Sequence, residues 1–227
     1  MFSFPDLSQF FGANILVGLI VTAACIVLIA DWRIALFALL AQYLLSALLL
    51  AGLVPLPMAL VRVVSGALAA AILYVTFRRA EVNYRRALRD AEDDAARLVI
   101  ERLYRLQVFV VGSPFRVFAL ALIAVGIIGI ASSMSFLDLF ADILFGGLWL
   151  IAAGVLVAIL SRDVLRLGLG ILTFTSGFVI LETATESSLL LYGLINISDL
   201  LLALVIANLA ALPSDEAGLR RRRGEMR

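Results

Sequence analysis

Apolar residues along this chain are grouped into seven long runs, and polar residues lie in short clusters between them. The length of each run is close to or above the roughly 20 residues that a helix needs to cross the hydrocarbon core of a bilayer. Helices are favoured because a spanning segment must satisfy its own backbone hydrogen bonds, and the runs lack the alternation typical of a membrane β-barrel. The predicted spans are residues 12–30, 33–54, 57–77, 115–133, 140–160, 164–183 and 188–211. The pattern therefore predicts an all-α polytopic membrane bundle with seven transmembrane helices.

Composition supports a membrane location and excludes several kinds of chemistry. Of the 227 residues, 63% are hydrophobic, compared with about 45–50% in soluble domains, and the mean hydropathy is +1.10. Histidine and lysine are absent, which excludes a histidine metal site and Schiff-base chemistry on lysine. The single cysteine, Cys25, lies inside the first span and is expected to be a small buried side chain. We expect no catalytic residue, no metal site and no cofactor in this chain.

The arginines predict the orientation of the chain in the membrane. When the seven spans alternate, all of the 18 arginines except Arg62 fall on the same side. The positive-inside rule assigns that side to the cytoplasm, so the N-terminus is predicted outside and the C-terminus inside. Residues 1–11 contain no basic residue, so we expect the first span to be retained and not removed as a signal peptide.

The chain divides into four segments. The charged segment 78–114 is predicted to form a cytoplasmic helical loop, because opposite charges four residues apart, such as Glu81 and Arg85, support a helix. Two roles of this segment remain open: a solvated linker, or a docking surface for a cytoplasmic partner. The basic tail is predicted to anchor the topology. The segments are residues 1–77 with three spans, 78–114, 115–212 with four spans, and the cytoplasmic tail 213–227.

Small residues within the spans predict where helices pack closely. The pairs Gly66/Ala70 and Gly126/Gly129 would each allow a neighbouring helix to approach. Gly168 and Gly170 are interpreted in the same way and not as a phosphate-binding loop, because no strand precedes them.

Asp199 is the strongest candidate for function. It lies near the middle of the last predicted span, where a charged carboxylate is costly unless it is paired, protonated or hydrated. An ionisable residue at that depth is a functional hypothesis by default. The alternative is structural, with Asp199 protonated or hydrogen-bonded to a neighbouring helix to define packing.

Three further polar residues are candidates for a proton or ion path. Arg62 lies in the third span, and its depth slightly favours a side chain that extends to the outer surface, although it could turn inward as counter-charge to Asp199 or Glu182. Glu182, at the outer end of the sixth span, is expected to be a hydrated loop acid. Gln42 in the second span would suit a polar path.

Hydroxyl side chains in the sixth span would extend that polar path. Thr173, Thr175 and Ser176 lie close together in the sequence of this span. Hydrogen bonds from such hydroxyls to their own helix would explain them equally well. They therefore do not by themselves indicate a path.

The C-terminal third resembles a known family. Residues 161–166 (SRDVLR), a glycine-rich apolar span and residues 195–199 (INISD) are similar to hydrogenase-4 component E. That family is related to the K-type membrane subunit of respiratory complex I and to the C subunit of Mrp-type cation/proton antiporters. The N-terminal half is similar at residues 31–33 (DWR), at Gln42 and at residues 78–79 (RR).

The resemblance implies an integral subunit of a multisubunit energy-converting complex that supports proton or sodium translocation. The partners would be antiporter-like membrane subunits, and the location would be the prokaryotic cytoplasmic (inner) membrane. Asp199 matches the acid of the family's last span. Thr175 stands where the family tends to have a glutamate, and Ser65 or Gly66 where a lysine is expected, which suggests a reduced proton path.

Two other classes of protein remain open at this point. A stand-alone small secondary transporter or channel would usually show discontinuous helices or related halves, and the two halves of this chain do not match. A membrane-embedded enzyme would need acids or a nucleophile clustered at one membrane face. Any redox cofactor is expected in partner subunits, and no nucleic-acid partner is expected.

Overall fold

The computed structural model describes residues 5–89, 98, 112–133, 141–185 and 188–211, and within these it contains seven long α-helices and no strand. Six of them are long and apolar enough to cross a membrane, and the first contributes the shorter apolar stretch Gly12–Leu28. This confirms the predicted all-helical membrane bundle. The helices are α1 (Pro5–Leu28), α2 (Trp32–Leu50), α3 (Leu56–Arg89), α5 (Ser113–Ser133), α6 (Ala141–Leu160), α7 (Val164–Thr185) and α8 (Leu189–Ala211).

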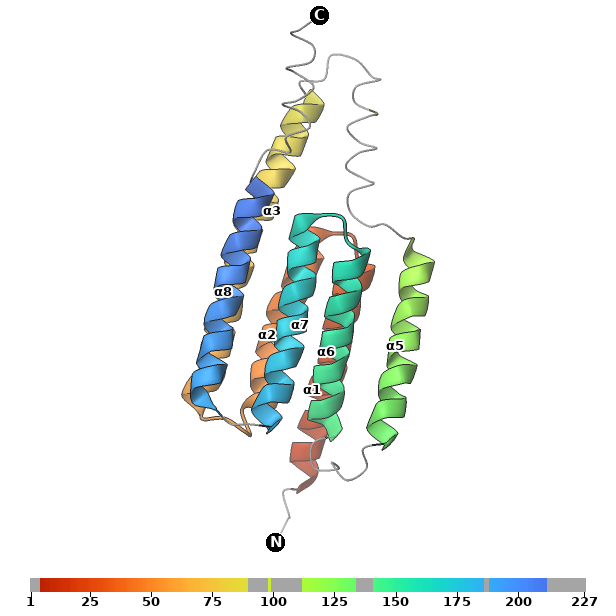
Figure 1. Cartoon of the computed structure of the whole chain (residues 1–227), viewed down its shortest axis with the longest axis vertical. Helices are drawn as coiled ribbons and strands as arrows, with labels where there is room; N and C mark the ends of the chain where they lie inside the picture. The colour runs from red at the N-terminus through yellow and green to blue at the C-terminus, as the bar shows by residue number, and fades with distance from the viewer. Residues whose placement is uncertain (1–4, 90–97, 99–111, 134–140, 186–187, 212–227) are drawn as a thin grey trace, which may run out of the picture.

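The contacts between helices join six of them in a closed ring, and α5 lies to one side of the others (Figure 1). The order around the ring is α1, α2, α3, α8, α7 and α6, and α2 also contacts α7 across the centre. Helix α5 packs at the edge, mainly on α6 and to a lesser extent on α1. The contact between α2 and α7 brings residues of the second and sixth predicted spans into the middle of the bundle.

Helix α3 extends beyond the predicted span, which ends at residue 77, and continues without a break to Arg89. Its extension carries the Glu81–Arg85 ion pair, four residues apart as the sequence predicts. Most of the predicted cytoplasmic loop, residues 90–97 and 99–111, and the basic tail lie outside the described residues.

Direct contact between backbones holds α6 and α7 together. Gly147 and Gly154 are seven residues apart on α6, as are Gly170 and Gly177 on α7, so each pair lies on one helix face. A Cβ on Gly154 would lie 2.4 Å from the backbone nitrogen of Phe174 and 2.6 Å from the carbonyl oxygen of Gly170. These glycines therefore allow an approach that any side chain would prevent.

The predicted small-residue contacts have mixed outcomes. Gly66 is confirmed as a close contact, since a Cβ there would lie 2.3 Å from Cγ of Tyr43, and Gly168 packs in the same way against Ile206. The prediction for Gly126 and Gly129 is wrong, because a Cβ on either would meet nothing within 4 Å. Both lie on exposed positions of the edge helix α5.

Two arginines at the predicted cytoplasmic end bind the C-terminus of α1. Arg116 at the start of α5 donates from Nη1 to the carbonyl oxygens of Val27 and Leu28, each at 3.0 Å. Arg166 on α7 donates to the carbonyl oxygen of Ile29 at 3.0 Å and to that of Ala30. The last carbonyls of a helix lack partners within it and carry partial negative charge, which these cations offset. The two residues therefore also fasten three helices together.

Candidate functional site

Arg62 and Asp199 form an ion pair in the interior of the bundle. Nη1 of Arg62 lies 2.7 Å from Oδ2 of Asp199, and neither side chain has any exposed surface. Arg62 is six residues from the start of α3, and Asp199 is ten residues from the start of α8. At 1.5 Å per residue these positions are about 9 and 15 Å along their helices, so the pair lies inside the candidate membrane spans and not at their ends.

The structure decides between the two orientations considered for Arg62. The slight preference for an outward-extending side chain is wrong, and the inward alternative with Asp199 as partner is confirmed. Depth along α3 allowed both orientations. The rotation of α3 decided the outcome, because it turns the face with Arg62 toward α8.

Tyr43 on α2 supports both members of the pair. Its hydroxyl donates to Oδ2 of Asp199 at 2.9 Å, so this carboxylate oxygen accepts from Tyr43 and Arg62 together. The guanidinium carbon of Arg62 lies 4.3 Å from the centre of the Tyr43 ring, which is a favourable cation–π distance. Gly66 leaves room for this ring on α3.

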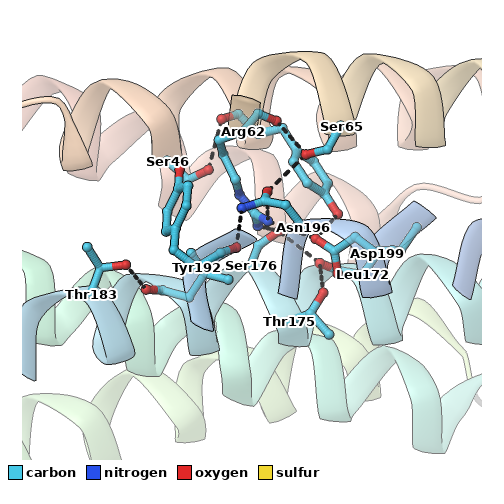
Figure 2. Close-up of polar contacts among 12 residues, drawn as sticks. Ser46, Arg62, Ser65, Leu172, Thr175, Ser176, Thr183, Tyr192, Asn196 and Asp199 are labelled. Atoms are coloured by element: carbon cyan, nitrogen blue, oxygen red, sulfur yellow. Dashed lines mark hydrogen bonds and ion pairs between the residues drawn. The ribbon is translucent and has the colours of Figure 1, made fainter. Parts of the chain in front are cut away.

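Neutral oxygens complete the surroundings of the guanidinium (Figure 2). Arg62 donates from Nη1 to Oδ1 of Asn196 at 3.2 Å and from Nη2 to Oγ of Ser176 at 2.8 Å. Ser65 donates to the same Asn196 oxygen at 2.9 Å. We call the six residues from α2, α3, α7 and α8 the polar cluster: Tyr43, Arg62, Ser65, Ser176, Asn196 and Asp199.

Several buried polar atoms in and beside the polar cluster have no hydrogen-bond partner within the described part of the chain. They are Oδ1 of Asp199, Nε of Arg62 and both amide atoms of Gln42, which has no exposed surface. An unsatisfied buried polar group costs about 1–3 kcal/mol, and more when it is charged.

The remaining predicted residues have different outcomes. Glu182 is buried and only 8% exposed, so the expectation of a hydrated loop acid is wrong. It lies six residues beyond Ser176 on α7, about 9 Å along the helix.

Thr173 and Thr175 donate to the carbonyl oxygens of Leu169 and Leu172 on their own helix, at 2.8 and 3.1 Å. For these two threonines the structural alternative holds.

The sequence interpretation missed the role of Tyr43. The sequence does contain a signal for this role. Tyr43 directly follows Gln42, and Ser46 lies three residues further along, so polar side chains gather on one face of α2. In a span that is apolar on nearly every face, such a polar face indicates a helix contact. Its partner on α8, however, is 156 positions away in the sequence.

Fold and site together define a polytopic α-helical membrane protein with a buried ion pair at its centre. Among the described residues, no group of three or more Cys, Asp or Glu side chains is placed to hold a metal ion. No family model, no curated protein and no solved structure matches the chain.

Proposed function

We propose that this chain is an integral subunit of a multisubunit energy-converting membrane complex of the hydrogenase-4 component E type. It supports proton or sodium translocation through the polar cluster. The observation that carries the proposal is the Arg62–Asp199 pair, fully buried inside a bundle of spanning helices. Such pairs are weak stabilisers, because desolvation offsets their attraction, and ionisable residues inside membrane proteins are typical of ion pathways.

The two carboxylate oxygens of Asp199 suit different tasks in proton transfer. Oδ2 is held by Arg62 and Tyr43, whereas Oδ1 accepts no hydrogen bond from the described residues. A proton that arrives would bind at Oδ1, which changes the net charge of the pair from zero to plus one, and would leave from the same oxygen. Asn196 and Ser176 would still accept from Arg62 in the protonated state.

The positions that depart from the resemblance favour a complex over a stand-alone transporter. Thr175 bonds to the carbonyl oxygen of Leu172, and Ser65 bonds to Arg62 and Asn196. Neither side chain titrates in the physiological range, so neither replaces the expected glutamate or lysine as a proton carrier. We infer that the path continues on partner subunits.

Extraction of the tagged protein in mild detergent tests the complex, with identification of what co-purifies. The expected result is a fixed ratio of antiporter-like and hydrogenase- or dehydrogenase-like subunits. A single clean species that takes up ions in liposomes would contradict the proposal and support the stand-alone transporter.

Coupled proton translocation by membranes with the assembled complex tests the role of Asp199. Asp199→Asn should reduce translocation, and so should Arg62→Met combined with Asp199→Asn, which removes both charges. Thr175→Val is the matched control, because that hydroxyl bonds only to its own helix among the described residues. An assembled complex that carries the double substitution and pumps normally would show that the pair serves packing.

A further inference from the structure

A groove outside the polar cluster runs between α2 and α3 on the half of the bundle that is predicted to be cytoplasmic. Its volume is about 740 Å³, within the range of roughly 300–1,000 Å³ typical of ligand sites. Small residues of α3, Ala67 and Ala71, form part of its wall, and Phe37, Leu40 and Tyr74 border it. The groove is therefore apolar along most of its length.

The mouth of the groove is positively charged. Arg33 on α2 and Arg78 on α3 line it, and both are exposed. Arg78 also lines a neighbouring hollow of about 400 Å³ that continues along α3 past Arg79 and Arg86. Two acids among the described residues lie beside Arg33: Glu81, which lies 3.5 Å from Arg33 and also pairs with Arg85, and Asp31, which accepts from the backbone nitrogen of Arg33. Arg33, Arg78, Arg79 and Arg85 outnumber these two acids, so the net charge at the mouth remains positive.

The length and polarity of the groove match one leaflet of a bilayer. From Arg33 to Leu40 is seven residues and from Arg78 to Ala67 is eleven, which correspond to about 10 and 16 Å along the helices. Half of the hydrocarbon core is about 15 Å thick. In the predicted orientation, the charged end would therefore lie near the level of the lipid phosphates, and the apolar end would point toward the bilayer centre.

We propose that this groove binds an anionic phospholipid of the cytoplasmic leaflet. Arg33 and Arg78 bind the phosphate group, and an acyl chain lies along Ala67 and Ala71 between the larger side chains of the two helices. Basic pockets between spanning helices on the cytoplasmic side are a recognised form of lipid head-group site. The alanines provide the space that a leucine or phenylalanine would fill.

Native mass spectrometry of the purified protein tests the proposal, with phosphatidylglycerol and zwitterionic phosphatidylethanolamine added in equal amounts to delipidated protein. The expected result is a retained phosphatidylglycerol adduct. Arg33→Gln with Arg78→Gln should reduce its retention about tenfold or more, as expected for the loss of two basic contacts. Ala71→Phe should reduce retention of both lipids, because it fills the groove.

Matched controls separate the groove from general effects of charge and bulk. Arg162→Gln removes an exposed arginine from the same side, and Ala121→Phe adds an aromatic ring on the exposed surface of α5. Both should leave the adduct unchanged, and thermal unfolding should show that all variants are folded. Equal retention of the two lipids, or an unchanged adduct in both groove variants, would overturn the proposal.

A cross-linking experiment in intact membranes tests the occupant directly. Ala71→Cys carrying a photoreactive group should capture lipid after illumination. Capture of another protein in place of lipid would also overturn the proposal, because it would assign the groove to a neighbouring membrane helix. Neither experiment depends on proton translocation, so failure of one proposal leaves the other open to its own test.

Discussion

The sharpest prediction concerns the order of stability among variants of the Arg62–Asp199 pair. Arg62→Met would leave the carboxylate of Asp199 buried without its counter-charge, and Asp199→Asn would leave the guanidinium of Arg62 in the same situation. Removing one partner of a buried ion pair typically costs about 3–5 kcal/mol. For a chain of this size, that corresponds to a fall in thermal midpoint of about 6–20 °C.

The double variant, Arg62→Met with Asp199→Asn, should be more stable than either single variant. The remaining side chains of the polar cluster retain partners in this variant, because Ser65 still donates to Asn196, Ser176 to Leu172 and Tyr43 to the amide oxygen at position 199. The amide nitrogen introduced at position 199 is the group without a partner, which costs about 1–3 kcal/mol. The two single losses add to at least about 6 kcal/mol, so the interaction energy of the double-mutant cycle should be about 3 kcal/mol or more.

The free energy of unfolding in mixed detergent micelles measures all four proteins, with thermal unfolding as a second assay. If the unpaired buried charge causes the loss in each single variant, the double variant should recover part of that loss. Additive losses, or an Asp199→Asn protein as stable as the parent, would refute this cause and would show that water or another group compensates the charges.

Three further predictions concern the hydrogen bond of Tyr43, the close approach of α6 and α7, and the orientation of the chain in the membrane. Tyr43→Phe should cost about 1.5–3 kcal/mol in the same unfolding assay, since it removes a hydrogen bond to a charged group; no loss would contradict the assignment of this bond. Gly154→Ala should lower the free energy of unfolding by about 1–3 kcal/mol or more, because the added methyl group clashes with α7. Gly126→Ala, with open space around it, should be neutral or stabilise by up to about 1 kcal/mol. Equal effects of the two substitutions would argue against the α6–α7 contact. With the native cysteine replaced, an impermeant maleimide should label Gly52→Cys in intact cells, because this position is predicted outside. It should label Arg162→Cys only after the membrane is opened, because this position is predicted inside. The reverse pattern would invert the predicted orientation.

The number of helices and the approximate position of each apolar span could be predicted because the bilayer sets them. A span needs about 20 apolar residues, and charged clusters end it, so both signals are local in the sequence. The extension of α3 to Arg89 went beyond the prediction, because residues after position 77 are helical without being apolar. The end of α2 at Leu50 is earlier than the predicted 54, because residues 51–54 form a turn before Pro55.

Sequence alone also located the acid at the centre of the last span, because depth along a helix follows from counting residues. What it could not determine was the direction in which each side chain points. A soluble helix shows its buried face by an apolar stripe, but these spans are apolar on nearly every side. The inward turn of Arg62, the burial of Glu182 and the exposure of Gly126 therefore depended on how each helix is rotated against its neighbours. Only the tertiary structure brings Tyr43, Arg62 and Asp199 together, because contacts between helices distant in the chain decide those rotations.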